Sequence, residues 1–191
     1  MKSLSFELKK IQRNDDDKVI GGEIHLKRKE FELWNFNEES KEFVFDSTEK
    51  ITKGVKFIGA FVKNESNEYE ISFDEKSAIS KEELSNAIEN SESFFSIKDI
   101  NHFVKSLILT HDLKKKMNKY QSKGWDKFYL CIAKDVNENE VSFNFASKPF
   151  ATRENKSEFY FQKLKENNLK HGRIFPFLNV EDIENYEKLS F

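Results

Sequence analysis

The sequence predicts an α+β fold built on a mainly antiparallel sheet. Apolar and polar residues alternate through the first third of the chain and again in two later hairpin patterns, and helical spacing follows each hairpin. Alternation with period two is typical of strands with one buried and one wet face, and this order of strands and helices is typical of α+β proteins. No Pro-, Gly- or Ser-rich linker divides the chain, so we expect a single globular domain over 1–191.

The first third of the chain predicts several short strands. Apolar residues alternate over 4–8, and the polar stretch 13–17 is expected to form a loop. A second strand is expected to begin at Ile24 and a third at Phe31, before a turn at 37–40. These segments are bounded by polar clusters, as strands in antiparallel sheets usually are.

Three further patterns extend the predicted sheet. Phe43 and Phe45 alternate with their neighbours, which predicts that both rings lie on a buried face. Two hairpins are expected over 55–73 and 128–145, because each combines apolar alternation, a polar turn and a second alternating run.

The sequence predicts about four helices. Ser80, with Glu83 three residues later, forms a capping box that opens the first helix. Apolar residues at helical spacing predict the longest helix near 97–121. Two more helices are expected, one over 158–167 and one that begins after Asn179.

The overall charge argues against a nucleic-acid coat or a membrane-surface protein. The chain has 32 basic and 34 acidic side chains and a formal net charge of −2. The balance is uneven, because residues 1–95 carry 15 basic and 21 acidic side chains while residues 96–191 carry 17 and 13. Two solvated faces explain this asymmetry most simply, and an acidic surface for a basic partner is the functional alternative.

The remaining composition predicts a soluble, cytoplasmic, bacterial protein. The N-terminal residues have no apolar signal-peptide region, and the longest uncharged apolar run, 57–62, is far shorter than the ~20 residues that span a bilayer. Cys131 is the only cysteine, which excludes an intrachain disulfide, and its apolar neighbours predict a buried, inert thiol. The excess of Lys, Asn and Phe indicates an AT-rich, bacterial genome.

The sequence contains no recognisable catalytic or metal-binding motif, and we expect no cofactor. There is no H-x-x-x-H, C-x-x-C, G-x-S-x-G or phosphate-binding glycine loop. His102 and His111 are nine residues apart, which places them on opposite faces of a helix. Asp15, Asp16 and Asp17 lack the alternate ligand spacing and the distant Glu of a calcium loop, so a solvated loop is expected there.

Nucleic-acid binding is the weaker interpretation of the aromatic strands. Aromatic residues over 127–130 and 142–145 lie on one predicted hairpin in the basic half of the chain. Such rings can stack on bases, but they alternate with polar residues, as core rings also do. The octapeptide with interleaved aromatics that marks ribonucleoprotein-type domains is absent.

The clearest candidate for a binding surface is an aromatic cluster with acidic neighbours. Alternation fails at Leu33 and Trp34, so one of them is expected to point away from the main core. A partly exposed Trp among acids is typical of a protein-binding anchor, although another part of the chain could cover it. The predicted partner-binding residues are Trp34, Phe36, Glu38, Glu39, Asp15, Asp16 and Asp17.

Two functional hypotheses follow. The preferred one is a non-catalytic protein-binding domain that neutralises a basic partner, as immunity proteins and antitoxins do. The alternative is an enzyme or nucleic-acid-processing protein whose site is assembled from residues distant in sequence. A deep pocket with convergent polar groups would favour the enzyme, and an acidic patch centred on an aromatic residue would favour the binding protein.

Overall fold

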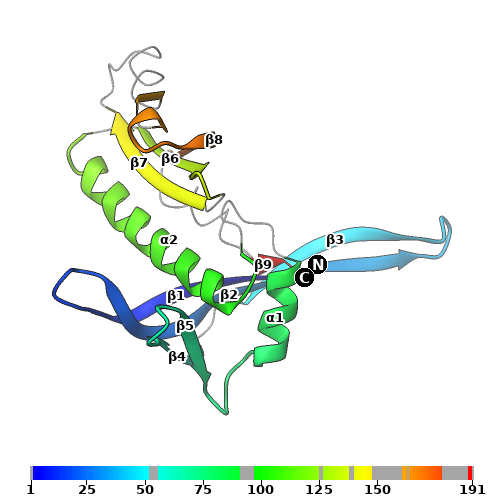
Figure 1. Ribbon diagram of the computed structural model, residues 1–191. Helices are drawn as coiled ribbons and strands as arrows, with labels where there is room; N and C mark the ends of the chain where they lie inside the picture. The colour runs from blue at the N-terminus through cyan, green and yellow to red at the C-terminus, as the bar shows by residue number, and fades with distance from the viewer. Residues whose placement is uncertain are drawn as a thin grey trace. The chain divides into compact units, whose positions relative to one another are not determined.

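A computed structural model describes residues 2–51, 56–90, 97–124, 127–137, 140–147, 161–162, 164–177 and 189–190 (Figure 1). The chain divides into two compact units, one formed by 1–109 with 186–191 and the other by 110–185. Both described sheets are antiparallel and helices accompany them, so the fold is α+β. The single domain expected over 1–191 stays a prediction.

The first unit is built on a six-stranded sheet. Its strands are β1 (Lys2–Arg13), β2 (Val19–Asn37), β3 (Glu42–Ile51), β4 (Lys56–Lys63), β5 (Tyr69–Phe73) and β9 (Leu189–Ser190). They lie in the order β5-β4-β2-β1-β9, with β3 also paired to β2. The hairpin expected over 55–73 is confirmed, since β4 and β5 pair antiparallel from Gly59↔Phe73 to Lys63↔Tyr69.

β2 is one continuous strand of 19 residues, so the two separate strands expected from Ile24 and Phe31 are wrong. The sequence signal was misleading because β2 changes its neighbours along its length. It pairs with β4 over 21–26 and with β3 over 29–37, while β1 lies along 19–31. A strand with different neighbours at its two ends does not keep one pattern of burial.

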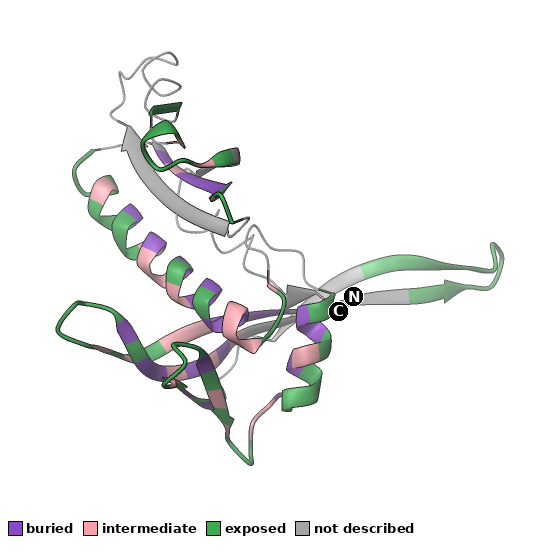
Figure 2. Ribbon diagram, viewed as in Figure 1, coloured by how far each residue is buried: buried purple, intermediate pink, exposed green. Residues whose placement is uncertain are grey.

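Two helices contribute to the core of the first unit. The short helix α1 (Lys81–Glu89) begins with the predicted capping box, because Ser80 Oγ accepts from the Glu83 amide at 3.0 Å and the Glu83 carboxylate accepts from the Ser80 amide at 2.9 Å. The first turns of α2 (Ile100–Gln121) pack on the sheet, where the Phe103 ring meets Phe6 edge-on at 5.1 Å. Figure 2 shows buried residues on both helices and on the strands of this sheet. The core includes Leu4, Phe6, Ile24, Leu26, Ile58, Phe61, Leu84, Ile88, Phe103 and Val104.

A bulge in β4 decides which of its residues enter this core. Ile24 pairs with Gly59 and His25 pairs with Phe57, so Ile58 is an extra residue on β4. The extra residue reverses the alternation, and Ile58 is fully buried while Phe57 is exposed. Gly59 is required beside the bulge, because a Cβ atom there would lie 2.3 Å from the backbone oxygen of Ser72.

The second unit holds a three-stranded antiparallel sheet. Its strands β6 (Lys127–Lys134), β7 (Glu140–Ser147) and β8 (Lys170–Phe177) lie in the order β7-β6-β8. Pairing of β6 with β7 confirms the hairpin expected over 128–145. The buried residues of β6 include Phe128, Leu130, Cys131, Ile132 and Ala133.

The longest described helix is α2, with 22 residues, which confirms the helix expected near 97–121. Gly124 follows it with φ +76°, a left-handed conformation typical of a residue just after a helix. The prediction of about four helices is slightly too high, because three helical segments are described: α1, α2 and a short one within 161–166. The helix expected after Asn179 lies outside the described residues.

Candidate interaction surface

The ends of β2 and β3 form a two-stranded arm. Pairing of β1 with β2 ends at Lys2↔Phe31, and pairing of β4 with β2 covers only 21–26. Beyond Phe31, β2 therefore pairs with β3 alone among the described strands. Figure 1 shows the arm, in blue and cyan, extending from the rest of its sheet.

The arm carries aromatic residues at facing positions. Phe36 pairs with Phe43, and their ring centroids lie 5.4 Å apart in an edge-on contact. Trp34 occupies the register position opposite Phe45. Phe36, Phe43 and Phe45 are 47%, 69% and 49% exposed. Because directly opposed residues in an antiparallel pair share a face of the sheet, Phe36 and Phe43 present their rings to solvent together.

This exposure overturns the expectation that Phe43 and Phe45 lie on a buried face. The alternation is real, because both residues lie in β3. Alternation reports only that the two faces of a strand differ, and burial needs a second layer that covers one of them. Phe36 is exposed, and its role in partner binding stays a prediction, while the exposure of the Trp34 side chain lies outside the described residues.

Acidic residues surround the aromatic pair at the tip. Residues 35–46 include four carboxylates, those of Glu38, Glu39, Glu42 and Asp46, and one basic residue, Lys41. Lys41 Nζ contacts Glu38 Oε2 at 2.9 Å, and all of these side chains are exposed. The Asn37 side chain organises the turn, because its Oδ1 accepts from the amides of Glu39 and Ser40 at 2.9 and 3.1 Å. The arm thus combines an exposed aromatic face with a net negative tip.

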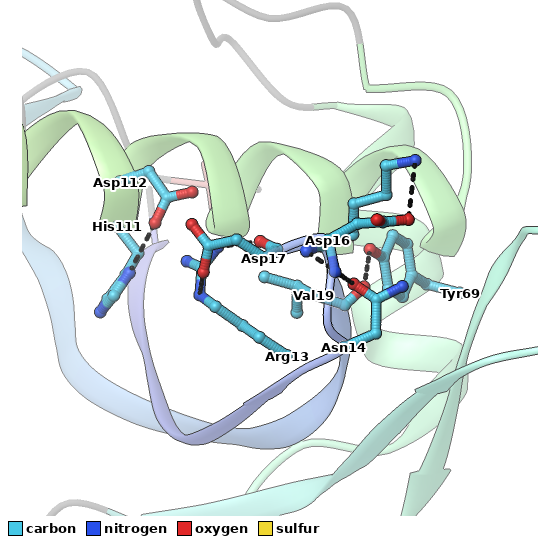
Figure 3. Close-up of polar contacts among 9 residues, drawn as sticks. Arg13, Asn14, Asp16, Asp17, Val19, Tyr69, His111 and Asp112 are labelled. Atoms are coloured by element: carbon cyan, nitrogen blue, oxygen red, sulfur yellow. Dashed lines mark hydrogen bonds and ion pairs between the residues drawn. The ribbon is translucent and has the colours of Figure 1, made fainter.

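The second predicted acidic group closes a turn at the other end of β2. Asn14 Oδ1 accepts from the amides of Asp16 and Lys18, and Arg13 Nη1 donates to the Asp17 carbonyl at 2.8 Å (Figure 3). The acids are solvent-exposed, as the loop prediction required.

The two predicted acidic groups therefore do not form one surface. The 19-residue strand β2 separates the turn before Val19 from the arm, and an extended strand of that length spans about 60 Å. Asp15, Asp16 and Asp17 accordingly belong to a separate turn, and the arm alone carries the aromatic and acidic combination.

One polar cluster was missed by the sequence argument. The Glu23 carboxylate accepts from Lys10 Nζ at 2.7 Å and lies 2.9 Å from His25 Nε2. The Lys10 contact, followed by that of His25, lowers the pKa of Glu23. The His25 ring also lies against Phe57, and its buried Nδ1 has no hydrogen-bond partner among the described residues. The pairing of β1 with β2 is irregular between Lys9 and Gln12, and this irregularity brings Lys10 to Glu23. The local sequence pattern did not indicate it.

The remaining candidates for reactive groups are the buried thiol of Cys131 and two histidines that each lie beside a single aspartate. Cys131 is fully buried, and burial raises the pKa of its thiol to about 12, so the nucleophilic thiolate is disfavoured. His111 Nδ1 lies 3.3 Å from Asp112 Oδ1, and His102 Nδ1 lies 2.8 Å from Asp99 Oδ1. Within the described ranges, no group of three or more His, Cys, Asp or Glu side chains is placed to hold a metal ion.

Comparison with known proteins assigns the chain to no family. No family model matches it, and no curated protein or solved structure matches it significantly. Among the described helices, none is both long and apolar enough to cross a bilayer.

Proposed function

We propose that this chain is a non-catalytic protein-binding domain whose binding surface is the β2–β3 arm and whose partner is basic. The observation that carries the proposal is the exposed Phe36–Phe43 pair beside an acidic turn. Aromatic residues contribute strongly to binding when a partner covers them, and nearby exposed charges mainly guide the encounter.

The acidic tip favours a partner of the opposite charge. Residues 35–46 have three more negative than positive side chains, and the one lysine is already paired with Glu38. A basic surface would be attracted to this tip, whereas an acidic surface would be repelled. Neutralisation of a basic toxin by a bacterial immunity- or antitoxin-like protein is the biological role that fits such a surface.

The experiment compares proteins captured by variants of the full-length chain. The wild type, Phe43→Ser and Phe161→Ser are immobilised and exposed to an extract of the native cell, and retained proteins are identified by mass spectrometry. Phe161 is the matched control, because it is a similarly exposed phenylalanine, at 65%, outside the arm.

We expect a basic protein that is retained by the wild type and by Phe161→Ser but lost from Phe43→Ser. The purified pair should then associate more slowly as salt is added, because screening shortens the range of the attraction. The proposal would be contradicted if Phe43→Ser retained the captured protein as well as the wild type does. It would also be contradicted if the captured protein were acidic and its association rate did not depend on salt.

A further inference from the structure

Among the described residues, the outer edge of β3 is unpaired in the arm. β3 pairs with β2 along one edge, and no other described strand pairs with it. An edge strand presents a row of backbone N–H and C=O groups that can pair with another extended chain. Natural edges are usually protected by proline, bulges or inward-pointing charges. The stretch 42–45, Glu-Phe-Val-Phe, has no proline and one charged residue, Glu42, and the register irregularity near Asp46 follows it directly.

The arm also lacks the layers that normally stabilise a hairpin. A two-stranded hairpin is marginally stable in water without a third strand or a packed face. Here the face formed by Phe36 and Phe43 is exposed, and β2 has no other strand beside it past Phe31 within the described sheet. A strand added to β3 would satisfy the open edge and extend the aromatic face at the same time.

From these features we infer that the arm recognises an extended polypeptide segment with alternating basic and apolar residues, which adds to the outer edge of β3 as a third strand. The inference rests on the proposed function and specifies the chemistry of the partner. Strand addition supplies main-chain hydrogen bonds, and alternate side chains supply specificity. The apolar side chains of the segment would lie beside Phe43 and Phe45, which occupy alternate positions of β3.

The basic side chains would lie on the other face of the new strand. Glu42 and Val44 occupy the alternate positions of β3, and Glu42 is exposed. Opposite charges on neighbouring strands stabilise a sheet, and like charges destabilise it. A second copy of the arm is therefore the poorer occupant, because it would bring the same excess of carboxylates to the same edge.

The test uses synthetic peptides and the full-length protein. The probe is an eight-residue, end-blocked peptide that alternates Lys and Val. Its controls are the same peptide N-methylated at its four central residues, which removes hydrogen-bond donors, and a peptide that alternates Glu and Val. Binding is followed by NMR, and amide hydrogen exchange is measured across β3.

The Lys–Val peptide should slow exchange of amides in 42–46 and bind at least tenfold more tightly than either control. Phe43→Ser should weaken its binding, while Phe161→Ser should leave it unchanged. Absence of Lys–Val binding at millimolar concentration overturns the inference, as does equal binding of the Glu–Val peptide.

Failure of the inference is distinguishable from failure of the proposed function. If the N-methylated peptide binds as well as the Lys–Val peptide, strand addition is wrong while a basic partner on the aromatic face still stands. If no peptide binds but the extract yields a basic protein that is lost from Phe43→Ser, only the strand-addition mechanism is wrong. If both experiments are negative, both proposals fall.

Discussion

Phe36 on β2 and Phe43 on β3 face each other across the arm with ring centroids 5.4 Å apart, and both rings remain about half exposed or more. A paired aromatic contact of this kind is usually found inside a core or an interface. In the core of the same unit, Phe6 on β1 and Phe103 on α2 make a similar edge-on contact and are almost fully buried. The two contacts resemble each other in geometry and differ in solvent exposure, which makes them a test of what the arm contributes to stability.

Truncation of the exposed ring should cost little stability. Phe43→Ala removes one aromatic contact worth about 0.5–1.5 kcal/mol and leaves no buried cavity. Phe103→Ala should instead cost about 3–5 kcal/mol, because it opens a cavity among buried side chains. Denaturant unfolding of the two variants measures the difference. Equal losses would show that the arm is packed in solution.

Trp34→Ala tests the anchor predicted from the sequence. Trp34 lies on β2 beyond the last β1 pair, opposite Phe45. We expect the fold to survive and the partner, once captured, to dissociate faster, since a desolvated aromatic contributes more than rim charges. Thermal denaturation comes first. A loss of about 3–5 kcal/mol would place the ring in the core and remove Trp34 from the binding surface.

Charge reversal at the turn should change the rate of encounter. Glu38→Lys with Glu39→Lys converts the tip from net negative to net positive, and both side chains are exposed. Association with a basic partner should slow, with a smaller change in dissociation, because exposed charges steer more than they hold. Asp15→Lys with Asp16→Lys is the matched control, because those acids lie in the other turn of β2. The association and dissociation rates of both double variants are measured by stopped flow at low and high salt. If the two double variants slow association equally, the acidic residues of the arm have no special role.

Cys131 should react only when the protein unfolds. Its thiol is fully buried, and burial raises its pKa from 9.0 to about 12. A thiol reagent should therefore label the native chain no faster than the chain unfolds. Rapid labelling at pH 8 would show instead that the thiol is accessible.

The raised pKa of the Cys131 thiol should make the free energy of unfolding depend on pH. Because the folded pKa is raised, the neutral thiol's contribution is fully present below about pH 9 and is lost as pH rises toward 12. Cys131→Ala should remove this part of the alkaline loss of stability. Unfolding free energies of the wild type and the variant, compared between pH 8 and 10.5, provide the measurement, and parallel curves would contradict the prediction.

Local signals allowed several elements to be predicted correctly. The capping box at Ser80 and Glu83 needs only four consecutive residues, and the structure forms both of its hydrogen bonds. The hairpins and the longest helix follow from runs of alternating or helically spaced apolar residues that lie close together in the chain. These features depend on interactions between near neighbours in sequence.

The structure decided matters that depend on distant segments. Ile58 is buried and Phe57 is exposed because the pairing of β4 with β2 contains a bulge. Lys10 on β1 meets Glu23 on β2 because the two strands pair with an irregular register. Register and bulges are set by how whole strands pair, so a local pattern does not reveal them.

At the candidate surface, too, some features follow from the local sequence and others depend on how distant segments pair. The residue pattern alone indicated that 31–45 is rich in aromatic and acidic residues, and that Leu33 or Trp34, where alternation fails, was a candidate for exposure. The pairing of distant strands established that Phe36, Phe43 and Phe45 are exposed and that Asp15, Asp16 and Asp17 lie at the other end of β2. The physical reason is that a strand's composition defines which of its faces is apolar, whereas burial depends on whether another layer of the fold covers that face.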